Sequence, residues 1–353
     1  MKKTFFIKFS ILLLVAILFF AARIYLDPFN VFHWKDIRFT SVSPNKNFIK
    51  TKLILSQPNK FNAFLFGSSR IGTMPPFSLP KSFNEKTLNW YNMTYPTGIP
   101  KEQLETIKTF VRNGVKIDMA IVQFDDLSMY ISTKNHQKEN ITMPYQIYER
   151  NKALFYLPYI KTKCELSLLK NIINYDKSKH ADEKRDFYAF GSYGVEMEIA
   201  NLSNLDETEV LEKYKPDDTW TYTESNSYKD IEDLVEFCDK NNINLVLLTT
   251  PLYHATYRVA VNKGYFDFLK KVAQKCEFYN FSSLNNFTKD YRYYLESIHY
   301  RPALGLIIEK LLFGNEEEKA KIREEAGDEL WGEKVNASNV DSVIQKLKEQ
   351  LAE

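Results

Sequence analysis

The longest apolar stretch of the 353-residue chain lies at its N-terminus. It runs from Phe9 to Ala22, follows three lysines, and continues to Leu26 with only Arg23 inside it. A membrane-spanning helix needs about 20 residues. The stretch reaches that length if Lys8 and Arg23 extend their charged ends toward the two interfaces. The pattern therefore predicts a transmembrane helix within residues 1–27.

The end of this stretch distinguishes an uncleaved anchor from a cleaved signal peptide. Cleavage requires small residues at the recognition positions, and the best small residue, Ala22, has the bulky Phe20 two positions before it. We therefore favour an uncleaved anchor, and we expect its helix to end at Asp27-Pro28. Lysines before the helix favour a cytoplasmic N-terminus. We expect a single-pass protein of the cytoplasmic membrane, with most of the chain periplasmic or on the cell surface.

Beyond residue 60, short apolar runs alternate with amphipathic stretches. The runs expected to form strands are Phe61–Gly67, Leu88–Met93, Asp118–Phe124, Ile243–Thr250 and Glu277–Phe281. The stretches expected to form helices are Glu102–Asn113, Tyr228–Asn241, Tyr265–Lys275 and Pro302–Phe313. Alternation of helices with continuously apolar strands predicts an α/β domain, with a parallel sheet covered on both faces.

The rest of the chain divides around this domain. Residues 28–60 are expected to form an irregular connector rising from the membrane, and residues 61–313 the α/β domain. Within the domain, residues 128–215 are polar and aromatic and predict a mainly helical insertion or cap. Residues 314–353 are charged and predict a helical extension, in which Trp331 and Val335–Val343 dock back onto the domain.

Charge and cysteine content exclude other classes of protein. With 47 basic and 45 acidic residues, the net charge of +2 gives no electrostatic case for binding nucleic acid. The three cysteines are Cys164, Cys238 and Cys276, and their wide spacing indicates neither a disulfide framework nor a zinc site. Cys238 falls on an apolar helical stripe, which predicts a core position.

Two short motifs carry the candidate chemistry, and the first is Gly67-Ser68-Ser69-Arg70. It directly follows the first predicted strand. A serine at a tight strand-to-helix turn projects its hydroxyl above the sheet edge, where backbone amides can face a developing oxyanion. Serine-rich turns also cap helices, so the motif indicates a nucleophile only together with a base elsewhere in the chain.

The second motif places Glu296 three residues before His299. On one loop or turn, such a carboxylate can hold the imidazole tautomer while the other ring nitrogen takes a proton from a serine. The same spacing occurs in exposed polar pairs and in metal sites, although no second cluster completes a metal site here. Ser69, His299 and Glu296 are therefore the candidate catalytic residues.

Together these segments resemble the SGNH hydrolase superfamily, in particular its single-pass, cell-surface members related to polysaccharide O-acylation proteins and to D-alanylation proteins of the DltD type. The resemblance covers about Phe61 to Phe313. It matches Gly67-Ser68-Ser69 to the first family block, Tyr91-Asn92-Met93 with Gly98 to the second, and Glu296 to His299 to the last. It implies a three-layer, flavodoxin-like parallel sheet, Ser69 as the nucleophile, and the Gly98 amide in an oxyanion hole.

This chain departs from the family pattern at two positions. The family has Asp where this chain has Glu296, a change that serine triads tolerate. The family's third block supplies an Asn donor, whereas this chain has Asp125-Asp126 after the third predicted strand. An ionised carboxylate beside an oxyanion opposes catalysis, so Asn92 is considered as a substitute donor.

Two further side chains are candidates for binding substrate. Arg70 can hold an anionic group, but an arginine at this position also pairs with a local carboxylate. His254 follows the Ile243–Thr250 strand at the edge where ligands bind in parallel sheets. The alternative to substrate contact is that His254 is a loop residue or makes a structural hydrogen bond.

The resemblance leads to two hypotheses of function. The first is an extracytoplasmic serine esterase or O-acyltransferase that acts on an acylated cell-envelope glycan or polymer, with no metal or organic cofactor. The second is a non-catalytic relative that assists a membrane-bound acyltransferase, which the Asp125-Asp126 departure motivates. The first requires Ser69 Oγ to lie within about 3–4 Å of a His299 ring nitrogen.

Overall fold

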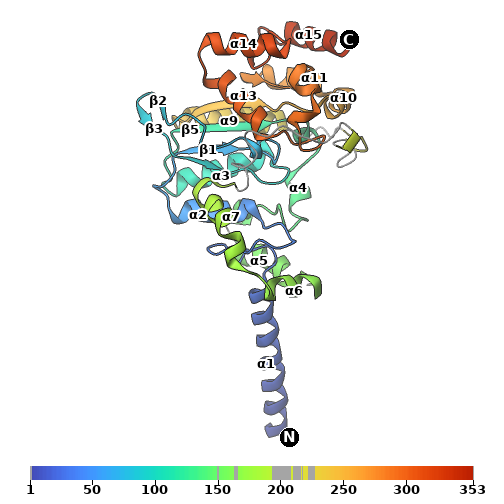
Figure 1. Cartoon of the computed structure of the whole chain (residues 1–353). Coiled ribbons are helices and arrows are strands. Elements are labelled where there is room, and N and C mark those ends of the chain that lie inside the picture. Colours follow the sequence, from blue (N-terminus) through green and yellow to red (C-terminus); the bar gives the residue numbers. More distant parts are fainter. Residues whose placement is uncertain are drawn as a thin grey trace.

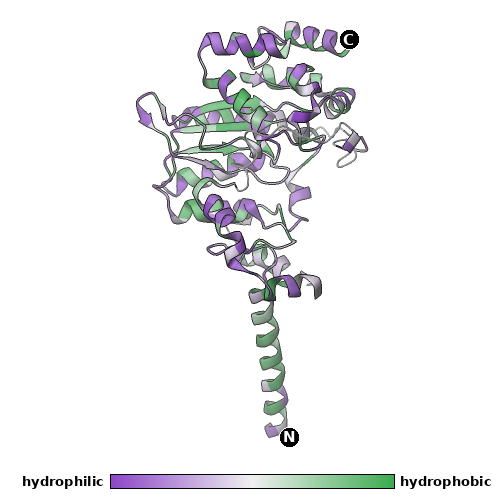
Figure 2. Ribbon diagram, in the orientation of Figure 1, coloured by the Kyte–Doolittle hydropathy of each residue, from purple (hydrophilic) through white to green (hydrophobic). Residues whose placement is uncertain are grey.

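The computed structural model describes residues 2–148, 151–162, 166–192, 208–209, 216, 218–221 and 227–352. Helix α1 (Lys2–Leu26) projects from the remainder of the chain (Figure 1), and most of its length is apolar (Figure 2). Its segment Lys3–Leu26 is long and apolar enough to cross a membrane, and its apolar window is not buried. The predicted N-terminal apolar helix is therefore confirmed.

A six-stranded sheet forms the centre of the molecule, in the order β4-β1-β5-β6-β7-β8. Its strands are β1 (Ala63–Phe66), β4 (Trp90–Asn92), β5 (Met119–Phe124), β6 (Asn244–Thr249), β7 (Phe278–Asn280) and β8 (Glu333–Val335). Strands β4 to β7 of this order run parallel, and β8 pairs antiparallel with β7. In chain order the parallel strands read 2-1-3-4-5, the flavodoxin-like doubly wound order. The α/β prediction is confirmed.

Helices cover both faces of the sheet (Figure 1). On one face lie α3 (Pro100–Arg112), α9 (Ser227–Lys240), α10 (His254–Asn262), α11 (Tyr265–Ala273) and α15 (Val340–Ala352), and on the other lie α13 (Pro302–Phe313) and α14 (Glu316–Ala326). Side chains alternate across a strand, so Phe64 and Phe66 enter the first core, whereas Ala63 and Leu65 enter the second. Both faces are buried, which explains the continuously apolar runs.

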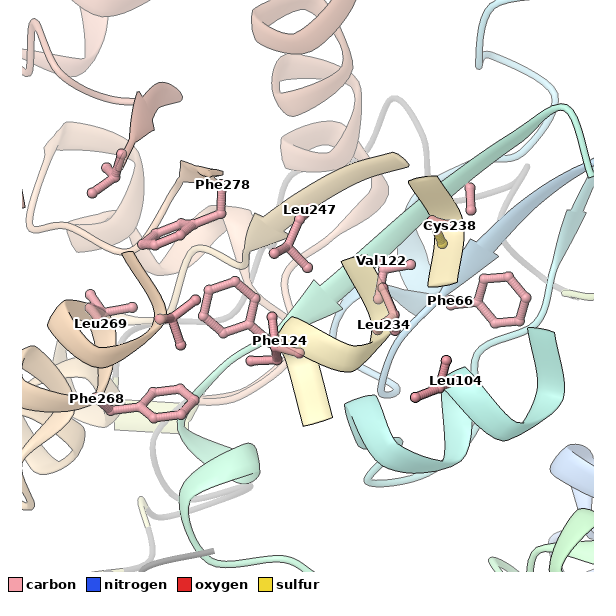
Figure 3. Close-up of a cluster of buried hydrophobic side chains, with 14 of the residues drawn as sticks. Phe66, Leu104, Val122, Phe124, Leu234, Cys238, Leu247, Phe268, Leu269 and Phe278 are labelled. Atoms are coloured by element: carbon pink, nitrogen blue, oxygen red, sulfur yellow. The ribbon is translucent and has the colours of Figure 1, made fainter. Parts of the chain in front are cut away.

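Aromatic side chains fill much of the first core. Phe124 at the end of β5 contacts Phe278 of β7 and Phe268 of α11, with ring centroids 5.1 and 6.0 Å apart (Figure 3). Cys238 on α9 is fully buried in the same core (Figure 3), as its apolar stripe predicts. These contacts hold the carboxyl end of β5 in place, next to the loops described below.

The expected irregular connector contains a helix, α2 (Lys46–Ser56). The Asn45 side chain begins it by accepting the Phe48 amide at 2.9 Å. Phe48 stacks on Phe155 of α5 (Lys152–Lys161), with ring centroids 4.8 Å apart. The prediction of an irregular segment is wrong for this half, because α2 buries its apolar side chains against the insertion.

The described part of residues 128–215 is mainly helical, as predicted. Besides α5, it contains α4 (Thr133–His136), α6 (Leu166–Ile173), α7 (Ala181–Phe190) and 3-10 turns at Tyr145–Tyr148 and Lys177–His180. Residues 149–150, 163–165, 193–207 and 210–215 of the predicted insertion lie outside the described residues. Arg23 Nε donates to the Ile160 carbonyl at 2.9 Å, which joins the end of α1 to α5.

The C-terminal segment is part of the sheet and is not an all-helical extension. Between α14 and α15, the three residues of β8 extend the sheet beside β7. Trp331 is fully buried and donates its indole N–H to the Phe281 carbonyl at 2.9 Å. The predicted docking of Trp331 is confirmed, and the predicted helical extension also contains a short strand, Glu333–Val335, that was not expected.

Short elements connect these layers. They are the hairpin β2 (Ser82–Phe83) and β3 (Lys86–Thr87), helix α12 (Asn286–Lys289), and 3-10 turns at Ile71–Thr73, Asp126–Met129 and Tyr291–Tyr293. Two of these turns follow the carboxyl ends of β1 and β5, the neighbouring strands where the strand order reverses. Ligands bind at this position in doubly wound sheets.

Candidate active site

Ser69 lies in the turn directly after β1, and the close packing of Gly67 shapes this turn. A Cβ at Gly67 would lie 2.5 Å from both Gln123 Oε1 and Ile71 Cγ2. Gln123 on β5 is fully buried, and its Oε1 accepts the Ser68 amide at 2.7 Å. The turn therefore needs glycine at its first position, and β5 fixes it from the side.

The Ser69 hydroxyl meets His299 across the edge of the sheet. Ser69 Oγ lies 2.8 Å from His299 Nε2. The Glu296 carboxylate bonds to His299 Nδ1, and the same oxygen accepts the His299 amide at 3.0 Å. The three candidate catalytic residues thus form one hydrogen-bonded array, and the distance required between Ser69 and His299 is met.

A tight loop holds Glu296 and His299 in this arrangement. Tyr294 and Tyr300 pair as an antiparallel bridge, and both are fully buried. Within the loop the Leu295 amide donates to the His299 carbonyl at 2.9 Å. Thr256 on α10 donates its hydroxyl to the Ser297 carbonyl at 2.5 Å. The histidine is therefore fixed by contacts on both sides, while its own side chain keeps 25% exposure.

Arg70 does not face a substrate site but forms a buried ion cluster. Its Nη1 lies 2.8 Å from Asp125 Oδ2 and also bonds to Asp126 Oδ1. The three side chains are at most 4% exposed. The expectation that Arg70 holds an anionic substrate group is therefore wrong. Its partners are carboxylates, as the alternative expected, but they are 55 and 56 positions away in the chain.

This cluster also changes the electrostatic argument about Asp125. Burial raises the pKa of Asp125 to about 6, although the Arg70 charge acts in the opposite direction. Asp125 Oδ1 accepts the Leu127 amide at 3.0 Å. Arg70 compensates the charge that was expected to oppose an oxyanion, so the Asp125-Asp126 pair has a structural partner.

Asn92 and Gly98 lie near Ser69, and their described bonds are structural. Asn92 donates one amide hydrogen to the Gly72 carbonyl at 3.0 Å and accepts the Thr94 amide at 2.9 Å. The Gly98 amide donates to the Tyr95 carbonyl at 3.2 Å. That bond contradicts the expected oxyanion role for Gly98 in this conformation. Among the described backbone hydrogen bonds, none uses the Ser69 amide as a donor.

Gly98 matters for packing instead. A Cβ there would lie 2.3 Å from the Gly67 carbonyl oxygen, so only glycine lets the two loops meet. The Tyr95 amide bonds to the same carbonyl at 3.4 Å. The loop after β4 thus rests directly on the turn that carries Ser69.

His254 begins α10, beside the loop that carries His299. Its ring lies 4.3 Å from that of Tyr253, and Tyr253 in turn packs against Tyr294 at 5.0 Å. The structure therefore puts His254 beside the loop that carries His299.

Sequence reasoning missed a second buried network behind the Tyr95–Gly98 loop. His136 Nδ1 lies 2.9 Å from Glu102 Oε2, and its Nε2 lies 2.9 Å from Thr97 Oγ1. Tyr95 donates its hydroxyl to the same Glu102 oxygen at 2.8 Å. Thr97 has a φ of +53°, a strained value for a β-branched residue. The network holds this loop against the Ser69 turn.

Sequence signals existed for two other residues of the site. Gln123 is the only polar residue within β5, and Lys50 directly follows the apolar pair Phe48-Ile49 in α2. A buried polar side chain in an apolar element needs a partner. For Gln123 that partner is the Ser68 amide, and for Lys50 it is the Thr94 carbonyl, at 2.7 Å.

Among the described residues, no group of three or more His, Cys, Asp or Glu side chains is arranged to hold a metal ion. No protein-family model and no curated protein matches this chain. The argument for function therefore depends on the geometry of the site itself.

Proposed function

We propose that the protein is a membrane-anchored, extracytoplasmic serine esterase or O-acyltransferase of the SGNH type that acts on an acylated cell-envelope glycan or polymer. The observation that carries the proposal is the 2.8 Å contact between Ser69 Oγ and His299 Nε2, with Glu296 bonded to the opposite ring nitrogen. A hydroxyl, an imidazole and a carboxylate in this order make up the triad of serine hydrolases.

The proposed chemistry proceeds through an acyl-enzyme. His299 Nε2 takes the Ser69 proton as Oγ attacks the ester carbonyl, and Glu296 stabilises the resulting imidazolium. The Ser69 amide supplies one donor to the oxyanion. When the carbon–oxygen ester bond breaks, His299 returns the proton to the departing alcohol. Water or a sugar hydroxyl then attacks the acyl-Ser69 carbonyl, losing its proton to His299 and restoring the Ser69 hydroxyl.

Two features of the fold support the SGNH assignment. The strand order 2-1-3-4-5 is flavodoxin-like, as the resemblance implies. The nucleophile follows the first strand, and the Glu–His loop follows β7, the last parallel strand. These positions bring the first and last motifs of the resemblance to one edge of the sheet.

The location in this proposal is supported by α1. A single apolar helix with lysines at its start is typical of an N-terminal anchor with a cytoplasmic start. Arg38 donates to the Tyr25 and Leu26 carbonyls at 2.8 and 2.9 Å, which satisfies two carbonyls at the C-terminal end of this helix. The substrate in this proposal lies within reach of a domain held near the membrane surface.

The test uses the full-length protein in detergent and a fluorophosphonate probe, which labels activated serines. We expect one adduct, located on Ser69 by mass spectrometry. Labelling should disappear in Ser69→Ala and slow by about 100-fold or more in His299→Ala, because general-base catalysis contributes about that much. The matched control is His180→Ala, since His180 also bonds to a carboxylate three residues away, Glu183, but contacts no serine hydroxyl in the described chain.

Equal labelling of wild type and Ser69→Ala would refute the nucleophile assignment. Absence of labelling in the wild type, with the fold intact, would favour the alternative of a non-catalytic partner for a membrane-bound acyltransferase. The feature that motivated this alternative, Asp125-Asp126, is accounted for by its ion pairs with Arg70. Ester hydrolysis with and without an added sugar acceptor then separates hydrolase from transferase activity.

A further inference from the structure

A pocket opens beside Ser69, on the side of the turn away from the sheet centre. Its volume is about 220 Å³. Four parts of the chain form its walls: α2, the Ser69–Thr73 turn, the loop after β4, and the residues that follow α7. The lining residues are Lys46, Lys50, Ser69, Gly72, Thr73, Asn92, Thr94, Tyr95, Pro96, Gly191 and Ser192. A ligand in this pocket would lie next to the candidate nucleophile.

Lys50 is the unusual member of this lining. It is 2% exposed, and its ammonium donates to the Thr94 carbonyl at 2.7 Å and lies 5.9 Å from the Phe187 ring. Burial, assisted by the charge of Lys46, lowers the pKa of Lys50 well below its ordinary value. A lysine ammonium has three N–H donors, and the described residues supply one acceptor.

The described residues around Lys50 in this pocket bring no negative charge. They include two lysines and no aspartate or glutamate. Buried charges in proteins are normally paired, and Arg70, next to Ser69 in the chain, is paired with two carboxylates. Within the described part of the chain, no carboxylate lining the pocket serves as a counter-charge for a protonated Lys50, and a bound anion would supply one.

We propose that this pocket binds a carboxylate or phosphate group carried by the ester substrate, with Lys50 as the buried charge partner of that group. The proposal rests on the function proposed above, because Ser69 makes the pocket part of the active site. It narrows the substrate to esters that carry a negative charge close to the scissile bond. The binding energy comes from a charge-assisted hydrogen bond in a largely desolvated place.

A purely structural Lys50 would make a different prediction. If the side chain served only to bond the Thr94 carbonyl, its loss would disturb the loop after β4 and would weaken the reaction of all esters alike. A charge partner for the substrate discriminates between esters instead. The ratio of kcat/KM for a charged ester to that for a neutral ester therefore separates the two roles.

The first experiment measures this ratio for full-length protein in detergent. The esters are 4-nitrophenyl hemisuccinate with 4-nitrophenyl butyrate, and 4-acetoxybenzoate with its methyl ester, so that the charge lies on either side of the scissile bond. In Lys50→Met we expect the charged-to-neutral ratio of at least one pair to fall about tenfold or more, because a hydrogen bond to a charge is lost. Lys50→Arg should restore most of it.

The control is Lys52→Met on the same helix. Lys52 lies over the rings of Trp34 and Tyr145 and does not line the pocket. Its removal should leave both ratios within about twofold of the wild type, as for surface changes in general. Equal losses for charged and neutral esters in Lys50→Met would overturn the proposal.

The second experiment does not depend on catalysis. In Ser69→Ala, inorganic phosphate or acetate should raise the Tm by about 2 °C or more at saturation, and Ser69→Ala/Lys50→Met should lose this shift. A Lys50-dependent shift, in a protein whose wild type hydrolyses none of the four esters, would support the anion site and refute the esterase proposal. If anions cause no Tm shift and the charged-to-neutral kcat/KM ratios are unchanged in Lys50→Met, the anion site is refuted while the esterase proposal stands.

Discussion

The buried cluster of Arg70, Asp125 and Asp126 makes a quantitative prediction about non-additive mutations. All three side chains are nearly inaccessible to solvent. Asp125→Asn or Asp126→Asn alone leaves Arg70 with one carboxylate partner, so each should change the free energy of unfolding by about 1 kcal/mol or less near pH 7.5. The double variant leaves Arg70 buried without a charged partner, which costs about 3–5 kcal/mol. The coupling free energy should then be about 1 kcal/mol or more.

The pH dependence of this cycle follows from the pKa of Asp125. In the folded protein that pKa is about 6, above the ordinary 3.8, so the folded state holds the proton more tightly than the unfolded state. The contribution of this group to stability therefore falls as the pH rises from about 4 to 6. Asp125→Asn removes that slope. At about pH 5, Asp125 is already protonated, so Asp126→Asn alone should cost more than it does near pH 7.5.

The assay is denaturant unfolding of the full-length protein in detergent, followed by tryptophan fluorescence. Trp331 is fully buried and reports on the domain. The cycle compares wild type, both single variants and the double variant at the two pH values. Additivity within about 0.5 kcal/mol near pH 7.5 would refute the account, because it would mean that the two carboxylates do not share Arg70 as their charge partner.

Three further predictions concern other parts of the chain. Gly98→Ala should slow fluorophosphonate labelling of Ser69 and lower the free energy of unfolding by about 1–3 kcal/mol, because the added Cβ would lie 2.3 Å from the Gly67 carbonyl oxygen. Labelling of this variant at the wild-type rate would contradict the predicted effect of the loop contact. Burial raises the pKa of Glu309 from 4.5 to about 8, so wild-type stability falls as the pH rises between these two values. Glu309→Gln should therefore raise the Tm more at pH 8 than at pH 5. Equal Tm shifts at the two pH values would contradict this account. Glu85→Gly in the β2–β3 turn, where φ is +64°, should raise the Tm by relieving about 1 kcal/mol of strain, and a lower Tm would contradict it.

Most of the fold could be predicted because its signals are local. The strands β1, β5 and β6 are continuous apolar runs, and α3, α9 and α11 carry clear apolar faces, so their type and order could be predicted from spacing alone. Two elements had no such signal. Helix α2 carries three lysines, and β8 has only three residues, Glu333–Val335, which form a strand because the edge of β7 pairs with them.

The candidate site divides in the same way. Ser69, His299 and Glu296 were candidates from their motifs, and the chemistry of hydroxyl, imidazole and carboxylate made them a natural set. The partners of Arg70, Asp125 and Lys50 were not readable, because each depends on residues or backbone atoms more than 40 positions away in the chain. The hydrogen bond of the Gly98 amide was missed for a different reason. The turn formed by Tyr95–Gly98 directs this amide toward the Tyr95 carbonyl, and the motif alone does not show that direction.

The sequence by itself determined the apolar N-terminal helix, the alternation that makes a parallel sheet, and the two motifs at its ends. These depend on residue type and spacing, which local physical rules can read. Only the tertiary structure decided that Ser69 and His299, 230 positions apart, lie 2.8 Å from each other. It also decided that Arg70 pairs with Asp125 and Asp126, and that Lys50 has no carboxylate partner among the described residues. Distances and burial depend on how distant segments pack, and a linear pattern carries no measure of either.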